Sequence, residues 1–270
     1  SKAEGRRVGV IGTIDCHYGK TIIPSEMTTP ASLDLNHHIR QMVDEGISDC
    51  FLEVSSHDLV KKRVYGMNFE VGIFTNLSRD HLDFHGSMED YEAAQARLFD
   101  GTFASHAVIS TADLAGRRMA RRAENAGMSV VTIDPHSADS TVSATGCTVT
   151  WRGRTLGVAT GGRFTVANAL VAAELALLLG CSEDDAVAGL ATATPVPGRF
   201  QPVSLAGGPV VSGDYAHTPD ALEAALAAAR DALNRSTGGS DRLPGRKSGR
   251  LVVVFGCGGE RDVGKRPLMG

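Results

Sequence analysis

Acidic and imidazole side chains concentrate in two short segments of this sequence, each directly after an apolar run. The first is Glu53-Val-Ser-Ser-His57 and the second is Arg79-Asp-His-Leu-Asp-Phe-His85. In an open α/β sheet, the carboxyl ends of the strands form the ligand crevice. Carboxylate oxygens suit a hard divalent cation, and mixed histidine and carboxylate sets also suit zinc. The candidate metal ligands are therefore Glu53, His81, Asp83 and His85. The alternative is that these residues only cap helices and turns.

Two later segments have the composition of a nucleotide site. Asp214-Tyr-Ala-His-Thr-Pro219 follows a predicted strand, and its carboxylate and imidazole could hold a ribose or a base. The glycine-rich segment 256–266 also follows an apolar run and carries Arg261, Lys265 and Arg266. Backbone N–H groups of such a turn, together with cationic side chains, suit a polyphosphate. A basic surface loop would show the same residues.

Two other patterns are interpreted as structural. Gly19-Lys20-Thr21 resembles the end of a Walker A loop, but Ile14 stands where that motif requires glycine, so Lys20 is predicted in a surface loop. Four arginines fall in one predicted helix, which indicates a solvated helix face: Arg117, Arg118, Arg121 and Arg122.

The elements that would position these residues alternate between short β-branched runs and longer helical stretches, which predicts βαβ units and a mostly parallel sheet flanked by helices. Strands are predicted at 8–12, 50–54, 71–76, 107–110, 129–133, 210–214 and 251–256. Helices are predicted at 32–45, with Ser32 as N-cap and Gly46 as terminator, and at 88–99, 112–126, 166–179, 183–192 and 220–233. Residues 137–164 predict a small antiparallel part. The proline-rich segment 194–199 predicts a boundary between domains at 1–197 and 198–270.

Composition excludes several classes of protein. The chain has 270 residues, 42% hydrophobic and 21% charged, with a formal net charge of −4. This balance argues against nucleic acid as the partner. No apolar run approaches the roughly 20 residues of a membrane span. The five cysteines form no C-x-x-C pair, and they predict reduced thiols and a cytoplasmic protein.

Six segments in this order resemble the Mur ligase family, and most of all its MurE group. They are Thr28-Thr-Pro30, Glu53–His57, Phe74–His85, Val196-Pro-Gly-Arg199, Asp214–Pro219 and Phe255-Gly-Cys-Gly-Gly-Glu-Arg-Asp262. The resemblance covers nearly the whole chain. It implies a Mur ligase central domain, the ATPase-type domain, over 1–197. The first part of a Rossmann-like C-terminal domain would follow over 198–270.

The resemblance implies an ATP-dependent amide ligase of peptidoglycan precursor synthesis. ATP would phosphorylate the carboxylate of a UDP-MurNAc-peptide or a related substrate, and an amino-acid acceptor would displace phosphate from the acyl phosphate. Glu53 and His81 would each hold a Mg2+ ion, and Lys265 would assist catalysis. The nucleotide would contact Asn168, Arg199, Asp214, His217 and Arg261. The UDP-linked substrate would contact Thr28, Thr29, Ser55 and Arg63. The expected protein is a monomer.

Four features of the sequence differ from the family pattern and bear on this expectation. The family's phosphate loop would precede Val8, and the motif that selects the amino acid would follow Gly270, so the chain is expected to be a fragment and the amino acid stays undetermined. Gln95 stands where the family has a carbamylated lysine that holds the second Mg2+ ion. Thr165 stands where the family usually has asparagine. Two alternatives follow: a MurE-like paralogue acting as an amide ligase in specialised metabolism, and a degenerate, non-catalytic binding module.

Overall fold

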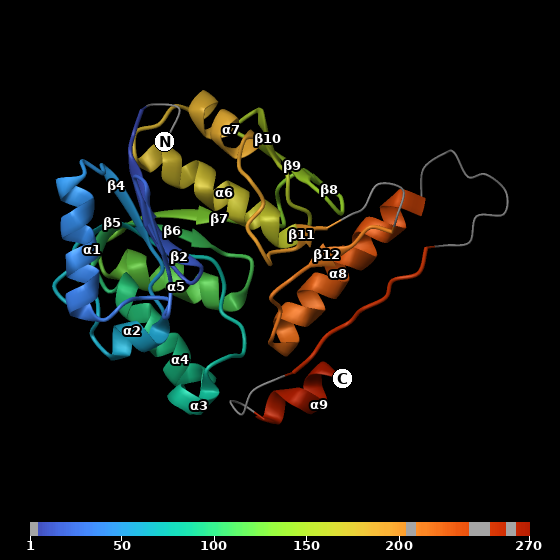
Figure 1. The fold of residues 1–270 in the computed structure, drawn as a ribbon, viewed down its shortest axis with the longest axis horizontal. Coiled ribbons are helices and arrows are strands. Elements are labelled where there is room, and N and C mark those ends of the chain that lie inside the picture. The colour runs from blue at the N-terminus through green and yellow to red at the C-terminus, as the bar shows by residue number, and fades with distance from the viewer. Residues whose placement is uncertain (1–4, 204–208, 238–248, 258–262) are drawn as a thin grey trace.

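A computed structural model describes residues 5–203, 209–237, 249–257 and 263–270 of the protein. Its larger part is built on two sheets (Figure 1). The first has the order β3-β2-β1-β4, with strands Thr21–Pro24, Asp15–Tyr18, Val8–Ile11 and Asp49–Leu52. The second has the order β5-β6-β7, with strands Phe69–Phe74, Ala104–Ser110 and Ser129–Ile133.

The pairing of these strands confirms an α/β fold with a parallel sheet and antiparallel parts. All strands of the second sheet are parallel, and in the first sheet β1 is parallel to β4, with Val8 opposite Asp49. The rest of the first sheet is an antiparallel hairpin that the sequence did not reveal, because β2 contains no β-branched run and β3 ends in proline. A third, antiparallel sheet confirms the hairpins expected in 137–164: β8 (Ser140–Val142), β9 (Cys147–Trp151) and β10 (Arg154–Val158).

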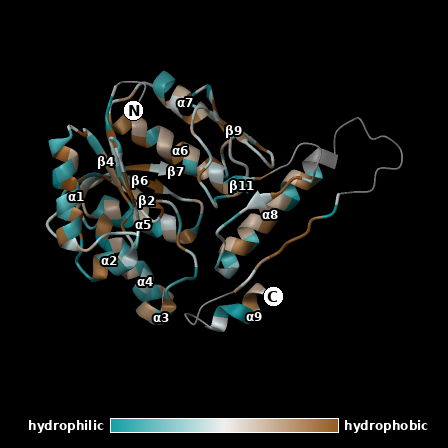
Figure 2. Cartoon of the chain, in the orientation of Figure 1, coloured by the Kyte–Doolittle hydropathy of each residue, from teal (hydrophilic) through white to brown (hydrophobic). Residues whose placement is uncertain are grey.

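Helices cover both faces of the parallel sheet β5-β6-β7. On one face, α5 (Leu114–Asn125) and the 3-10 turn η2 (Ala96–Phe99) enclose a core that contains Phe99, Ile109 and Met119. On the other face, α6 (Arg163–Leu178) and α7 (Glu183–Ala191) pack with the β8-β10 sheet around Val108, Leu156 and Val166. Figure 2 shows hydrophobic residues along β6, whereas α1 carries many hydrophilic residues.

A third core lies under the first sheet. There α1 (Ser32–Asp44) and α2 (Ser56–Val60) contribute Leu35, Met42 and Leu59, which pack with Ile11 of β1. Two short helices, α3 (Leu82–His85) and α4 (Met88–Gln95), follow β5. Gly46 takes a positive φ of 69° after α1, as predicted. The prediction of Ser32 as N-cap is wrong: Ala31 holds that position, and the Ser32 hydroxyl donates to the carbonyl of Arg63.

The part after residue 198 is smaller and more open. It has the two-residue strands β11 (Gln201–Pro202) and β12 (Ser212–Gly213), the long helix α8 (Pro219–Thr237), a 3-10 turn η3 (Val263–Lys265) and α9 (Arg266–Met269). The strand predicted at 251–256 is wrong, because no described strand pairs with it and Val254 is 96% exposed. None of the helices in the described ranges is both long and apolar enough to cross a membrane.

Candidate active site

Glu53 lies at the carboxyl end of β4, next to the carboxyl end of β1. The carboxylate Oε2 of Glu53 accepts hydrogen bonds from the backbone N–H and the hydroxyl of Thr13, at 2.7 and 2.5 Å. A Cβ atom on Gly12 would lie 3.0 Å from the Glu53 carboxylate carbon, so glycine allows this close approach. The parallel pairing of β1 and β4 thus fixes one oxygen of an otherwise exposed carboxylate.

The loop that carries Thr28 and Thr29 is hydrogen-bonded to Thr13 and Glu53. The Thr28 hydroxyl lies 3.2 Å from that of Thr13, and the buried Thr29 hydroxyl donates to the carbonyl oxygen of Glu53 at 2.7 Å. The structure therefore brings both predicted substrate residues to Glu53. Thr28 is the more accessible of the two, whereas the Thr29 side chain fixes the loop.

Ser55 and Arg63 hold α2 against the same loop. The Ser55 hydroxyl accepts from the backbone N–H of Asp58 at 3.3 Å and donates to the Asp58 carboxylate. Arg63 Nη1 donates to Asp58 Oδ1 at 2.8 Å and to the carbonyl of Thr29 at 2.9 Å. Since the Asp58 side chain is only 3% exposed, this ion pair is a buried anchor. Both residues thus position the loop, and their predicted contact with substrate stays a prediction.

A ring cluster of His57, His81, Phe84, His85 and Tyr91 lies beside α2. The rings of His81 and His85 lie 4.8 and 5.4 Å from that of His57, and Phe84 packs on His57 at 4.0 Å. Tyr91 of α4 stacks on His85 at 5.1 Å. Burial, reinforced by the neighbouring His81, lowers the pKa of both His57 and His85. These two imidazoles are therefore neutral near pH 7.

The four-residue metal set expected from the sequence is not assembled. Within the described ranges, no three histidine, cysteine, aspartate or glutamate side chains converge on one point as metal ligands. The reason is local: Nε2 of His85 is bonded to the Ser56 hydroxyl at 2.8 Å, and Asp83 is exposed on α3. The assignment of Glu53 and His81 as separate metal ligands stays a prediction.

Gln95 faces the ring cluster from α4. Its amide Nε2 donates to the Tyr91 hydroxyl at 3.3 Å, and the Tyr91 ring lies 5.8 Å from that of His81. Burial raises the pKa of Tyr91. Tyr91 is a neighbour of His81 that sequence reasoning missed, although its spacing of four residues from Gln95 places both on one helix face.

A second group of predicted residues surrounds Tyr215. Asp214 accepts hydrogen bonds from the backbone N–H groups of Phe200 and Ala216, both at 2.8 Å. The guanidinium of Arg199 lies 5.8 Å from the Tyr215 ring, and the His217 ring lies 5.2 Å from it. Tyr215 is 63% exposed and was not selected from the sequence. An exposed aromatic face flanked by a cation and an imidazole can stack on a planar base.

Asp80 lies between the ring cluster and the Tyr215 group. Its Oδ2 atom is 3.7 Å from Nε2 of His81 and 3.6 Å from Nε2 of His217. The backbone N–H of Arg79 also donates to Asp220 at the start of α8, at 2.9 Å. The ring cluster and the Tyr215 group therefore adjoin one another, although they lie far apart in the sequence.

The remaining predicted residues are less closely tied to these groups. Asn168 lies on the exposed side of α6, and Lys265 is half-buried at the end of η3. Thr165 is buried in the first turn of α6, where its hydroxyl donates to the carbonyl of Gly161 at 2.7 Å. Arg261 lies outside the described residues, as does much of the glycine-rich segment around it. Lys20 lies at the exposed tip of the β2-β3 hairpin, as predicted.

Comparison with known proteins places this arrangement in a family. A family model described as "Mur ligase middle domain" matches residues 1–176, which is more than half of the chain. The chain belongs to the Mur ligase family. A second model, "Mur ligase, glutamate ligase domain", matches residues 198–270. The domain boundary predicted at residue 197 stays a prediction.

Individual Mur ligases are similar in sequence to this chain over almost its whole length. Two curated relatives are named UDP-N-acetylmuramoyl-L-alanyl-D-glutamate–2,6-diaminopimelate ligase. The one from Geobacter metallireducens is 39% identical over 98% of this chain and 52% of its own length. The one from Chromobacterium violaceum is 38% identical over 98% of this chain and 53% of its own length. The chain therefore spans about half the length of these relatives.

A solved structure of a ligase with the same name has a similar fold. It superposes with a TM-score of 0.72 at 31% identity, and the match covers 99% of this chain and 54% of that one. The likeness extends across both the ring cluster and the Tyr215 group, because it includes almost every residue of this chain.

Proposed function

We propose that this chain acts in an ATP-dependent amide ligase of peptidoglycan precursor synthesis, which joins an amino acid to the peptide carboxylate of a UDP-MurNAc-dipeptide. The observation that carries the proposal is the 39% identity to a ligase of that name over 98% of the chain. The named relatives support 2,6-diaminopimelate as the amino acid. A cytoplasmic location belongs to the same proposal.

The reaction has two steps. The substrate carboxylate attacks the γ-phosphorus of ATP, so that an acyl phosphate forms and ADP leaves. The amine of the incoming amino acid then attacks the acyl carbon, phosphate leaves and the amine loses a proton. Both steps bring anions together, so the site must supply positive charge.

Glu53, together with the neighbouring Thr13, has the chemistry to hold Mg2+. Thr13 fixes one carboxylate oxygen, the side chain is exposed, and carboxylate oxygens are ligands that Mg2+ prefers. When bound there, Mg2+ would neutralise phosphate charge. His81 is the second proposed ligand. Thr28 and Thr29, with Ser55 and Arg63, would orient the UDP-linked substrate beside Glu53.

The Tyr215 group would bind the nucleotide. Tyr215 offers an exposed ring for the adenine, and Arg199, Asp214 and His217 surround it. Asn168 would contact the same nucleotide, and the cations of Arg261 and Lys265 would contact its phosphates. Asp80 would hold His217 close to His81, so that nucleotide and substrate meet.

The full-length protein tests this proposal through phosphate release from ATP with UDP-MurNAc-L-Ala-D-Glu and diaminopimelate. Glu53→Gln keeps the shape but removes the charge, and we expect kcat to fall at least about 100-fold, since ligand charge governs the metal site. Glu70→Gln, an exposed change on β5, is the matched control and should leave the rate unchanged. Absence of turnover in the unmodified protein would refute the proposal.

Gln95 favours a second candidate, an amide ligase of the same lineage that acts on another carboxylate. A neutral amide supplies one oxygen but no charge, and here it is bonded to Tyr91. If Gln95 only weakens a metal site in the peptidoglycan enzyme, Gln95→Lys should raise the rate severalfold, and more so with added bicarbonate. An unchanged or lower rate, together with faster turnover of a different carboxylate, would favour the second candidate.

A further inference from the structure

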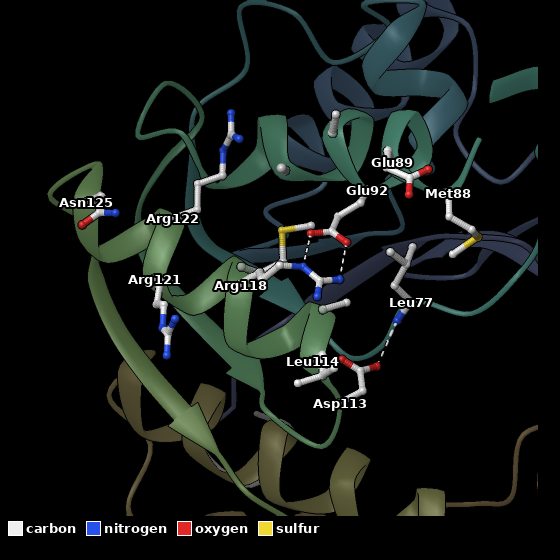
Figure 3. A pocket seen from close by; sticks show the side chains of 14 residues that line it. Leu77, Met88, Glu89, Glu92, Asp113, Leu114, Arg118, Arg121, Arg122 and Asn125 are labelled. Atoms are coloured by element: carbon white, nitrogen blue, oxygen red, sulfur yellow. Dashed lines mark hydrogen bonds and ion pairs between the residues drawn. The ribbon is translucent and has the colours of Figure 1, made fainter. Parts of the chain in front are cut away.

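A groove of about 1160 Å3 runs between α4 and α5, separate from the candidate active site (Figure 3). Helix α4 divides the two regions. Tyr91 and Gln95 face the ring cluster, whereas Glu89, Glu92 and Ala93 line the groove. No step of the proposed reaction uses the groove.

One end of the groove carries apolar side chains beside the carboxylates of Glu89 and Asp113 (Figure 3). Leu77, Met88 and Leu114 line it, and Leu114 is 68% exposed at the start of α5 (Figure 3). A leucine that stays this exposed beside other apolar side chains leaves hydrophobic area that a partner could cover.

The centre of the groove is braced by an ion pair. Arg118 donates two hydrogen bonds to the Glu92 carboxylate, at 2.6 and 2.5 Å, and so joins α5 to α4. This bidentate geometry fixes the spacing of the two walls.

The other end is basic. Arg121 and Arg122 line it together with Asn125, and within the described ranges neither guanidinium has a hydrogen bond or ion pair (Figure 3). Both lie in the last turns of α5, where the helix dipole favours cations. A solvated helix face would explain the two arginines by themselves. It does not explain why they line the same groove as the apolar side chains of Leu77, Met88 and Leu114.

We propose that this groove docks a short peptide segment of another protein, with apolar side chains for the Leu77–Met88–Leu114 end and acidic side chains for Arg121 and Arg122. Charge complementarity selects the acidic chemistry, and the groove between two helices suits an extended or helical segment. Glu89, on the α4 wall, disfavours an acidic segment lying along that side.

The test uses the full-length protein and a fluorescein-labelled helical peptide of about four turns, with leucines near one end and glutamates near the other. We expect saturable binding by anisotropy that weakens as salt is raised. The double variant Arg121→Glu and Arg122→Glu should weaken binding about tenfold, since it replaces attraction with repulsion. Arg117→Glu, an exposed change on the same helix outside the groove, is the matched control and should change the affinity less than about twofold.

Methionine methyl NMR then locates the binding. The signal of Met88, which lines the groove, should shift on peptide addition, whereas those of Met42 and Met128 in the cores should not. No binding, equal losses in the arginine variants and the control, or shifts confined to other methionines would overturn the proposal. So would self-association through this groove, or its occupation by another segment of the same protein.

Discussion

The part of the molecule before residue 198 and the part after it hold their predicted residues in different ways. Glu53 lies at the end of β4 and is joined by hydrogen bonds to Thr13 and to the Thr28–Thr29 loop, next to the packed core of the first sheet. The Tyr215 group lies beside a two-residue strand pair and the start of α8. Side chains held at strand ends can form a metal site before the metal binds. A segment with few packing contacts can instead move when a nucleotide binds.

The largest effect should come from matched core deletions in the two parts. Leu156→Ala removes a fully buried side chain from the first part and should lower the free energy of unfolding by about 3 kcal/mol. Leu222→Ala, in α8, should cost about 2 kcal/mol, because Leu222 is buried but belongs to none of the three core clusters. Urea unfolding followed by the fluorescence of Trp151, the single tryptophan, reports the first part. Equal decreases in the free energy of unfolding for both variants would contradict the proposed difference between the two parts.

The ring cluster should make stability depend on pH. Burial lowers the pKa of His57 and His85 below the ordinary value of 6.5, so the unfolded chain binds protons first as the pH falls. Stability should therefore fall as the pH drops below about 6.5 and level off below the folded-state pKa. His85→Gln should flatten this dependence, measured as the urea midpoint between about pH 7.5 and 5. His37→Gln, at an exposed site on α1, is the control. If the His85→Gln variant keeps the same dependence of stability on pH, His85 is not a source of that dependence.

The smallest effect should come from the contact that joins α8 to α6. Arg163 and Asp231 pair at 2.9 Å, but their side chains are 71% and 36% exposed. Arg163→Ala should change the free energy of unfolding by less than about 0.5 kcal/mol, since exposed ion pairs contribute little. A larger decrease in the free energy of unfolding, measured by thermal unfolding, would mean that the Arg163–Asp231 pair joins the two parts more rigidly than we expect.

Sequence patterns predicted most of the elements before residue 198 to within three residues. The strand at 129–133 is correct to the residue, and the helices near 32–45 and 183–192 are correct within one residue. The β2-β3 hairpin was missed because β2 (Asp15–Tyr18) contains no β-branched run and β3 ends in Pro24, which is untypical of a strand. The apolar run at 251–256 was predicted as a strand, but a strand also needs a neighbour to pair with.

Sequence by itself determined the family, because its six motifs are local runs of residues that keep their order along the chain. It also determined that Glu53 and His81 follow strands, since apolar periodicity and polar breaks lie in neighbouring residues. Only the tertiary structure decided that Thr13 holds Glu53, that His85 is hydrogen-bonded to Ser56, and that Asp80 reaches His217. These contacts join residues that are 29 to 137 positions apart, and their geometry depends on how the sheets and helices pack.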